Sequence, residues 1–253
     1  MSTPFHVVIP ARFDATRLPG KPLLQVAGHP LIRWVWECAR ASGAASVIVA
    51  TDDERVRSAA AAFGADVAMT SPQHASGTDR VAEVVRARGW PPGAIVVNLQ
   101  GDEPLMPAPV PARVAAGLAE HPQCGIGTAA APIASLGEFL DPSCVKVLRG
   151  GTGEALYFSR ASVPWPRDGV VDGRPNDFTH AWRHIGIYAY RVKTLLEFAG
   201  WPPTPLETTE KLEQLRALEH GMRVYVAELQ EAPPAGVDTP EDLERVRALL
   251  RAR

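Results

Sequence analysis

The sequence of 253 residues has little cysteine, almost no net charge and no long hydrophobic run. Its three cysteines, Cys38, Cys124 and Cys144, are far apart and form no CxxC pair. We therefore expect reduced thiols and a cytoplasmic protein. No stretch approaches about 18 consecutive apolar residues, so we expect no transmembrane helix and no membrane insertion. The amino-terminal stretch lacks a basic region before its short apolar run, so we expect no signal peptide.

The net charge of −2 arises from 26 Lys and Arg residues against 28 Asp and Glu residues. Nucleic-acid-binding proteins usually carry an excess of positive charge, so we expect no nucleic-acid partner. Any anionic ligand must instead meet a local cluster of basic side chains. The 21 glycines and 24 prolines are too few for a low-complexity chain, and 46% hydrophobic residues are typical of a globular protein.

Short apolar runs alternate with amphipathic patterns over residues 1–100. The runs predict strands at 5–10, 47–51, 66–70 and 94–100, and the patterns predict helices at 30–43, 53–64 and 78–89. The strand at 94–100 is almost uniformly apolar, as expected when helices cover both faces of a sheet. This order favours an α/β fold with a doubly wound, mainly parallel sheet.

The pattern changes between 136 and 200, where strand-like runs surround a proline-rich loop. We predict an inserted β-rich subdomain at 136–200, and a nucleotide-binding α/β core formed by 1–135 and 201–253. The tail predicts a helix at 209–221, a strand at 222–228 and a helix at 239–252. Thr239 and Pro240 are typical of the start of that last helix.

A basic loop follows the first strand, with Arg12, Arg17 and Lys21 around Gly20. In open parallel sheets, ligands bind at the carboxyl ends of the strands. Three cations and a glycine at that place suit a phosphate chain. The loop has neither the P-loop pattern nor GxGxxG, and a solvated basic loop is the alternative interpretation.

Two acidic residues could bind a metal. Asp102 follows the apolar strand 94–100 after a glycine, and Asp238 precedes the last helix. Carboxylates at such positions can hold Mg²⁺ beside substrate phosphates. A turn-forming role for Asp102 and a capping role for Asp238 are the alternatives.

Other motifs are weaker. Ser76 and Gly77 come directly before the helix at 78–89. A hydroxyl and a glycine turn at a helix start can hydrogen-bond a base or a phosphate, and an ordinary N-cap is the alternative. His180 and His184 are four residues apart but lack the HExxH pattern, so we expect no zinc site.

Seven segments in a fixed order complete the pattern. They are IPARFDATRLPGKPL (9–23), HASGTDRVAEV (74–84), NLQGDEP (98–104), VKVL (145–148) with ALYFSRASVPWPRD (155–168), RHIGIYAYR (183–191), LETTEKLEQLRALEHG (206–221) and GVDTPEDLERVR (236–247). With these segments the chain closely resembles the 3-deoxy-manno-octulosonate (Kdo) cytidylyltransferases, the CMP-Kdo synthetases of lipopolysaccharide biosynthesis. The resemblance covers nearly the whole chain.

The resemblance implies a nucleotide-sugar transferase fold with a β-containing subdomain for dimerisation, so we expect a homodimer. It implies the Mg²⁺-dependent reaction of CTP with Kdo to give CMP-Kdo and pyrophosphate. In that reading Lys21, Asp102 and Asp238 are catalytic, and the two aspartates bind the metal. The nucleotide would be bound by Pro10, Ala11, Arg12, Arg17, Lys21, Ser76, Gly77 and Arg80. The sugar acid would be bound by Gln100, Arg160, His184, Tyr188, Glu213 and Gln214.

Alternatives remain open at this point. The substrate could be a sialic acid or 8-amino-Kdo, or the chain could be a nucleotide-binding protein without catalytic activity. Sheet packing is the structural alternative for His184 and Tyr188, and an exposed helix surface is the alternative for Glu213 and Gln214.

Overall fold

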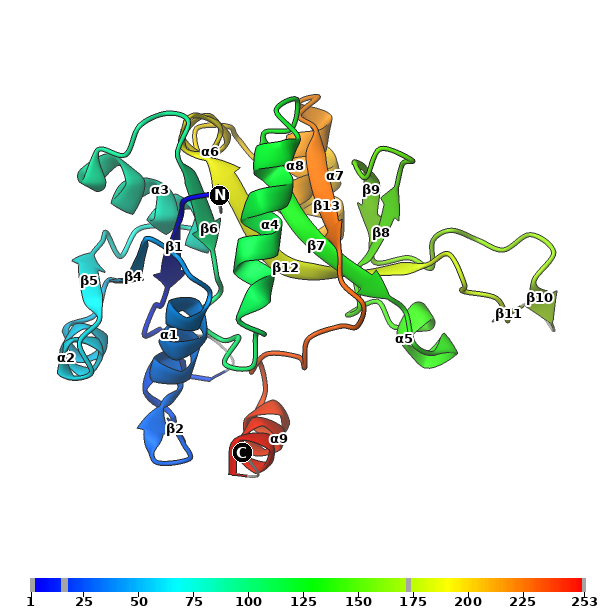
Figure 1. Cartoon of the computed structure of the whole chain (residues 1–253). Helices are drawn as coiled ribbons and strands as arrows, with labels where there is room; N and C mark the ends of the chain where they lie inside the picture. The colour runs from blue at the N-terminus through cyan, green and yellow to red at the C-terminus, as the bar shows by residue number, and fades with distance from the viewer. Residues whose placement is uncertain (1–2, 15–17, 172–173, 252–253) are drawn as a thin grey trace. The chain divides into compact units, whose positions relative to one another are not determined.

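The computed structural model describes residues 3–14, 18–171 and 174–251 (Figure 1). The chain divides into two compact units. The first unit comprises residues 1–116, 189–199 and 233–253, and the second comprises residues 117–188 and 200–232. The subdomain boundaries predicted at 136–200 stay a prediction.

A parallel sheet forms the centre of the first unit. Strand β1 (Phe5–Pro10) pairs in parallel with β4 (Ser46–Thr51) and with β6 (Ile95–Asn98), and β4 pairs in parallel with β5 (Asp66–Met69). Helices α1 (Leu31–Ala41), α2 (Glu54–Ala62) and α3 (Gly77–Arg88) connect these strands and pack against them (Figure 1). The consecutive residues Val7, Val8 and Ile9 are all fully buried, as a strand covered on both faces requires. The expected α/β fold with a mainly parallel sheet is confirmed.

The remaining elements of the first unit include the carboxyl-terminal helix, α9. They are η1 (Lys21–Leu23), β2 (Gln25–Val26), β3 (His29–Pro30), α6 (Val192–Phe198) and α9 (Pro240–Arg251). Leu243, Val246 and Leu250 form a helical apolar stripe on α9 and pack in one cluster with Leu31 and with the fully buried Val237. Burial of this stripe fixes the segment just before α9 against the first unit.

Two elements have residues in both units. They are α4 (Pro109–Glu120) and β12 (Trp182–Arg191). Within the second unit, β13 (Val224–Glu228) pairs in parallel with β7 (Ile126–Pro132), and β8 (Lys146–Arg149) pairs antiparallel with both β9 (Ala155–Ser159) and β12. The other elements are α5 (Leu136–Leu140), β10 (Val170–Val171), β11 (Arg174–Pro175), α7 (Pro205–Glu210) and α8 (Gln214–Glu219).

The continuous helix predicted at 209–221 is wrong. The structure has two short helices there, α7 and α8, and Lys211 between them is left-handed, with φ of 54°. The first of them starts earlier than predicted because Thr204 and Glu207 form a capping box around Pro205. The break turns the chain between Glu210 and Glu213.

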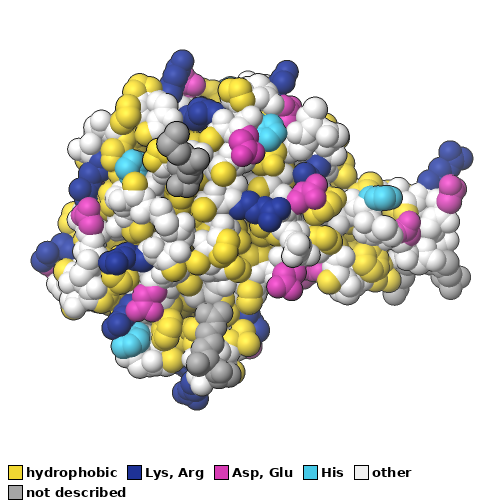
Figure 2. Space-filling model, viewed as in Figure 1, with side chains coloured by type: hydrophobic (Ala, Val, Ile, Leu, Met, Phe, Trp, Pro, Cys, Tyr) yellow, Lys and Arg dark blue, Asp and Glu magenta, His cyan; other side chains and the backbone are white. Residues whose placement is uncertain are grey.

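No helix in the described part of the chain is long and apolar enough to cross a membrane. Basic and acidic side chains are interspersed over the face drawn in Figure 2, in keeping with the net charge of −2.

Candidate active site

A cavity of about 410 Å³ lies in the first unit, beyond the carboxyl ends of β1 and β6 and at the start of α3. Ligands bind at this edge of parallel sheets. Its lining residues are Pro10, Ala11, Arg12, Lys21, Pro22, His74, Ala75, Ser76, Gly77, Arg80, Gln100, Gly101, Asp102 and Asp238. All predicted nucleotide-binding and metal-binding residues except Arg17 are among them, and so is Gln100, which was predicted to bind the sugar. Arg17 lies outside the described residues.

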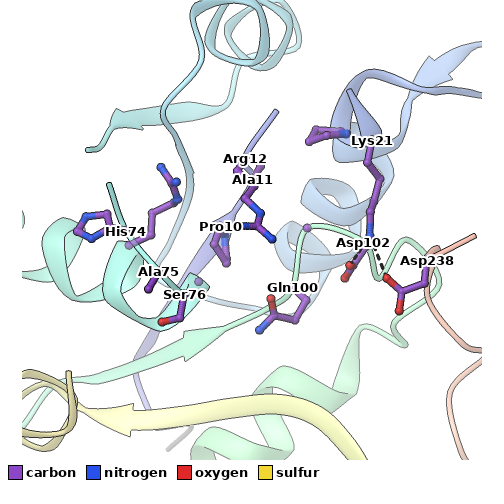
Figure 3. Close-up of a pocket in the computed structure, with 14 residues that line it drawn as sticks. Pro10, Ala11, Arg12, Lys21, His74, Ala75, Ser76, Gln100, Asp102 and Asp238 are labelled. Atoms are coloured by element: carbon purple, nitrogen blue, oxygen red, sulfur yellow. Dashed lines mark hydrogen bonds and ion pairs between the residues drawn. The ribbon is translucent and has the colours of Figure 1, made fainter. Parts of the chain in front are cut away.

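Lys21 lies between the two predicted metal ligands (Figure 3). Its ammonium nitrogen, Nζ, donates to Asp102 Oδ2 at 2.8 Å, to Asp238 Oδ1 at 3.2 Å and to the carbonyl of Val237 at 2.8 Å. One cation therefore holds two carboxylates together and leaves the cluster with a net negative charge. A divalent cation is attracted to such a cluster.

The backbone brings these two aspartates together. The amide of Val237 donates to the carbonyl of Asp102 at 2.8 Å. A Cβ on Gly236 would lie 2.7 Å from that same carbonyl, so only glycine permits this approach. Asp238 therefore stays beside Asp102 although the two residues are far apart in the sequence.

The carboxylate of Asp238 is not the side chain that caps α9. Thr239 Oγ1 accepts from the amide of Asp242 at 3.2 Å, and Asp242 Oδ2 accepts from the amide of Thr239 at 3.0 Å. These two side chains cap α9, as the sequence predicted for Thr239. The Asp238 side chain instead faces Lys21.

The start of α3 forms the opposite part of the cavity, since the view in Figure 3 places Ser76 and Lys21 on opposite sides of Pro10. Ser76 Oγ accepts from the amide of Asp79 at 3.1 Å, and Asp79 Oδ2 accepts from the amide of Ser76 at 3.1 Å. The Ser76 hydroxyl is thus an N-cap. A Cβ on Gly77 would lie 3.2 Å from Pro10 Cγ, so the helix start packs closely on the end of β1. Backbone amides are what this end offers an anion.

The two described arginines of the cavity differ in their partners. Arg80 is 3% exposed, donates to Asp52 Oδ2 at 2.7 Å and also donates to the Thr70 hydroxyl. Its guanidinium therefore ties α3 to the ends of β4 and β5. Arg12 is exposed and has no hydrogen-bond partner among the residues that the structure describes. Arg12 is the arginine that is available to a phosphate.

The second unit brings together several residues predicted to bind the sugar. The His184 ring lies 5.5 Å from the Tyr188 ring and 4.9 Å from that of Phe158, and its Nε2 is 3.0 Å from Thr128 Oγ1. Burial lowers the pKa of His184 to about 3, so this histidine stays neutral at pH 7. Burial, and then the charge of Glu213, raise the pKa of Tyr188. Gln214 is 6% exposed and follows Glu213 at the start of α8, so these two residues do not form an exposed helix surface.

Arg160 is held by the end of α7. Its backbone amide donates to Glu210 Oε2 at 2.8 Å, and its Nε donates to the Glu210 carbonyl at 2.7 Å. Glu210 Oε1 also accepts from the Ser159 hydroxyl at 2.8 Å. Glu210 is not among the residues predicted from the sequence, because an acidic residue in a helical pattern is typical of solvent-exposed surface. Its position within the segment 206–221 was the only signal.

Comparison with known proteins identifies the family. Residues 6–224 match the family model described as Cytidylyltransferase. The 3-deoxy-manno-octulosonate cytidylyltransferase of Pseudomonas fluorescens is 54% identical over 235 residues, which cover 92% of each chain. That of Halorhodospira halophila is 53% identical over 232 residues, which cover 90% of each chain. The chain belongs to the 3-deoxy-manno-octulosonate cytidylyltransferase family.

Two solved structures share the fold of this chain. The structure of CMP:2-keto-3-deoxy-manno-octonic acid synthetase complexed with CTP has a TM-score of 0.89, with 41% identity and 99% of each chain covered. A cytidylyltransferase from Leptospira borgpetersenii has a TM-score of 0.62 at 16% identity, covering 99% of this chain and 88% of the other, and so shares the fold. The family resemblance found in the sequence is confirmed.

Proposed function

We propose that this chain transfers a cytidylyl group from CTP to Kdo and forms CMP-Kdo and pyrophosphate. A hydroxyl oxygen of the sugar attacks the α-phosphorus in line, and the bond from that phosphorus to the oxygen bridging the α and β phosphates breaks. Pyrophosphate leaves with the electron pair of that bond, and the hydroxyl proton is lost to solvent. Such a reaction needs positioning and neutralised charge more than a covalent nucleophile. The observation that carries this proposal is the cluster of Lys21, Asp102 and Asp238 in the cavity.

The cavity supplies groups for each part of the nucleotide. Arg12 and Lys21 neutralise the phosphates, together with Arg17 by sequence. The backbone amide of Gly77 binds the nucleotide at the start of α3. Ser76, through its capping box with Asp79, and Arg80 hold that helix in place. The backbone carbonyls of Pro10 and Ala11 accept from the amino group of cytosine.

Asp102 and Asp238 fit a magnesium ion. Their carboxylate oxygens both accept from the Lys21 ammonium, so the two carboxylates are close enough to bind the same cation. Within the described residues, no group of three or more His, Cys, Asp or Glu side chains could hold a metal. A pair of carboxylates suits Mg²⁺, which keeps several waters and binds substrate phosphates. When bound, Mg²⁺ would stabilise the negative charge that develops on the phosphates.

We assign the sugar acid to Arg160, His184, Tyr188, Glu213 and Gln214 of the second unit, and the role of Gln100 in sugar binding stays a prediction. Arg160 is the cation of this set and pairs with the sugar carboxylate, and a neutral His184 and a protonated Tyr188 bind hydroxyl groups. We also propose a homodimer that uses the β-rich subdomain, where Trp165 and Leu156 are exposed. The cytoplasmic location stays a prediction.

The test is pyrophosphate release by the full chain with CTP, Mg²⁺ and a panel of acidic sugars: Kdo, 8-amino-Kdo and a sialic acid. We expect release with Kdo and its loss on chelation of the metal. A preference for another sugar would change the substrate and leave the nucleotide site intact. No release with any sugar, together with CTP binding in calorimetry, would establish the non-catalytic alternative. Sedimentation velocity tests the homodimer, for which a monomer would be the contrary result.

A further inference from the structure

A buried lysine lies behind Arg160. Lys146 begins β8 and is 0% exposed. Its ammonium donates to three backbone carbonyls, those of Asp141 at 2.9 Å, Cys144 at 2.6 Å and Arg160 at 2.9 Å. An ammonium group has three donors, so all of them are used. The three acceptors are uncharged, and burial lowers the pKa of this ammonium.

Such a lysine needs an explanation. Moving a charged side chain out of water is unfavourable, and uncharged acceptors compensate less than a carboxylate would. The next strand residue, Val147, is also 0% exposed and points to the opposite face, so this strand is buried on both faces. What Lys146 adds is a fixed geometry for the three carbonyls that it binds.

Those carbonyls surround the contacts of Arg160. Asp141 and Cys144 lie on either side of Pro142, whose carbonyl accepts from Arg160 Nη1 at 2.9 Å. The third carbonyl belongs to Arg160 itself. Lys146 therefore fixes both the backbone of Arg160 and the loop that holds its guanidinium. Among the described residues Nη2 has no hydrogen-bond partner, so this edge of the guanidinium is available to a ligand.

We propose that Lys146 is a positioning residue that sets the Arg160 guanidinium for the carboxylate of the sugar acid. The inference rests on the proposed function, and Lys146 itself touches no substrate. Two parallel N–H donors bind a carboxylate only when the guanidinium plane is correctly oriented. Loss of Lys146 should therefore weaken use of the sugar acid and leave the nucleotide site in the first unit unchanged.

The first experiment compares the wild type with Lys146→Met, whose side chain is unbranched, one atom shorter and without donors. We expect the KM for Kdo at saturating CTP to rise by about tenfold, as for a weakened charged hydrogen bond. The Kd for CTP, measured by calorimetry without sugar, should change by less than about twofold. A Lys146→Met protein that is less stable to heat but has an unchanged KM for Kdo would overturn the proposal.

A double-mutant cycle with Arg160→Lys decides whether Lys146 acts through Arg160. We expect the double variant to have the same KM for Kdo as Arg160→Lys alone, within about twofold, because the group to be positioned has already gone. A double variant whose KM for Kdo rises by the product of the two single-variant increases would overturn the proposal. If Lys146→Met does not fold, Lys146→Gln, which keeps an uncharged donor, enters the same cycle with the same criterion. Failure of the wild type to release pyrophosphate with Kdo would instead refute the proposed function.

Discussion

Gly101 allows the end of β1 to lie against the turn that carries Asp102. A Cβ built on Gly101 would lie 2.6 Å from the carbonyl oxygen of Pro10, whereas ordinary contacts of a Cβ begin at 3.4 Å. The Gly101→Ala substitution therefore forces a displacement of about 0.8 Å between two backbone segments. Neither segment is a flexible side chain that could move aside at little cost.

Two effects follow from this displacement. The overpacking should lower the free energy of unfolding by about 1–3 kcal/mol. The Pro10 carbonyl is also a group that we assign to the cytosine amine, and a hydrogen bond of about 2.9 Å that lengthens by about 0.8 Å is lost. Uracil has a carbonyl at that position, so the preference for CTP over UTP should fall by roughly ten- to a hundredfold.

The assay is competition between CTP and UTP at equal concentration in Kdo activation, with thermal unfolding measured on the same samples. Gly93→Ala is the matched control, because a Cβ on Gly93 meets nothing within 4 Å. The control should keep the wild-type preference and a stability within about 0.5 kcal/mol. A Gly101→Ala enzyme with unchanged unfolding and unchanged discrimination would refute the reasoning about the Pro10 carbonyl.

Three further predictions test individual side chains. Asp238→Asn should lower turnover by roughly a hundredfold or more, with little change in thermal stability because Thr239 and Asp242 cap α9. Glu241→Gln, at an exposed position, should leave turnover and stability unchanged, and the same loss of turnover in both variants would contradict a metal role for Asp238. Lys21→Met should weaken binding of CTP by about tenfold more than binding of CMP, which has no β or γ phosphate. Calorimetry measures both Kd values, and an equal rise in the two would contradict the role of Lys21 at those phosphates. In the folded chain the pKa of His184 is lowered to about 3, whereas in the unfolded chain it is near the usual 6.5. Below pH 6.5 the unfolded chain therefore takes up a proton at His184 that the folded chain does not take up. The free energy of unfolding should therefore fall as the pH drops from 7 to 4, by at most about 1.4 kcal/mol per pH unit from this group. His184→Gln should make this dependence on pH less steep, and an unchanged slope would refute the lowered pKa of His184.

The local pattern of apolar residues was enough to predict the parallel sheet. The predicted strand at 5–10 has the same bounds in the structure, and those at 47–51 and 66–70 differ by one residue at one end. Strands of this kind are buried on both faces, so their sequences are short continuous apolar runs. The cap at Thr239 was predictable for a similar reason, because it involves only residues within one turn of α9.

Where long-range packing decides the structure, the sequence was not sufficient. The alanine-rich pattern between 101 and 135, where α4 and β7 lie, suits helix and strand alike and so predicts neither. The single helix predicted at 209–221 failed at Lys211, whose left-handed backbone no local rule requires.

At the candidate site, too, the residues were predictable from the sequence and their contacts were not. The family motifs in the sequence were enough to predict Lys21, Asp102 and Asp238 as site residues. Only the tertiary structure placed the Lys21 ammonium between the two carboxylates and the Lys146 ammonium behind Arg160. The contacts of Lys21 join segments far apart in the chain, and the contact of Lys146 with Arg160 depends on the pairing of two strands. They form because burying the apolar stripe of α9 and pairing β8 with β9 lower the free energy of the whole fold, which no short stretch of sequence records.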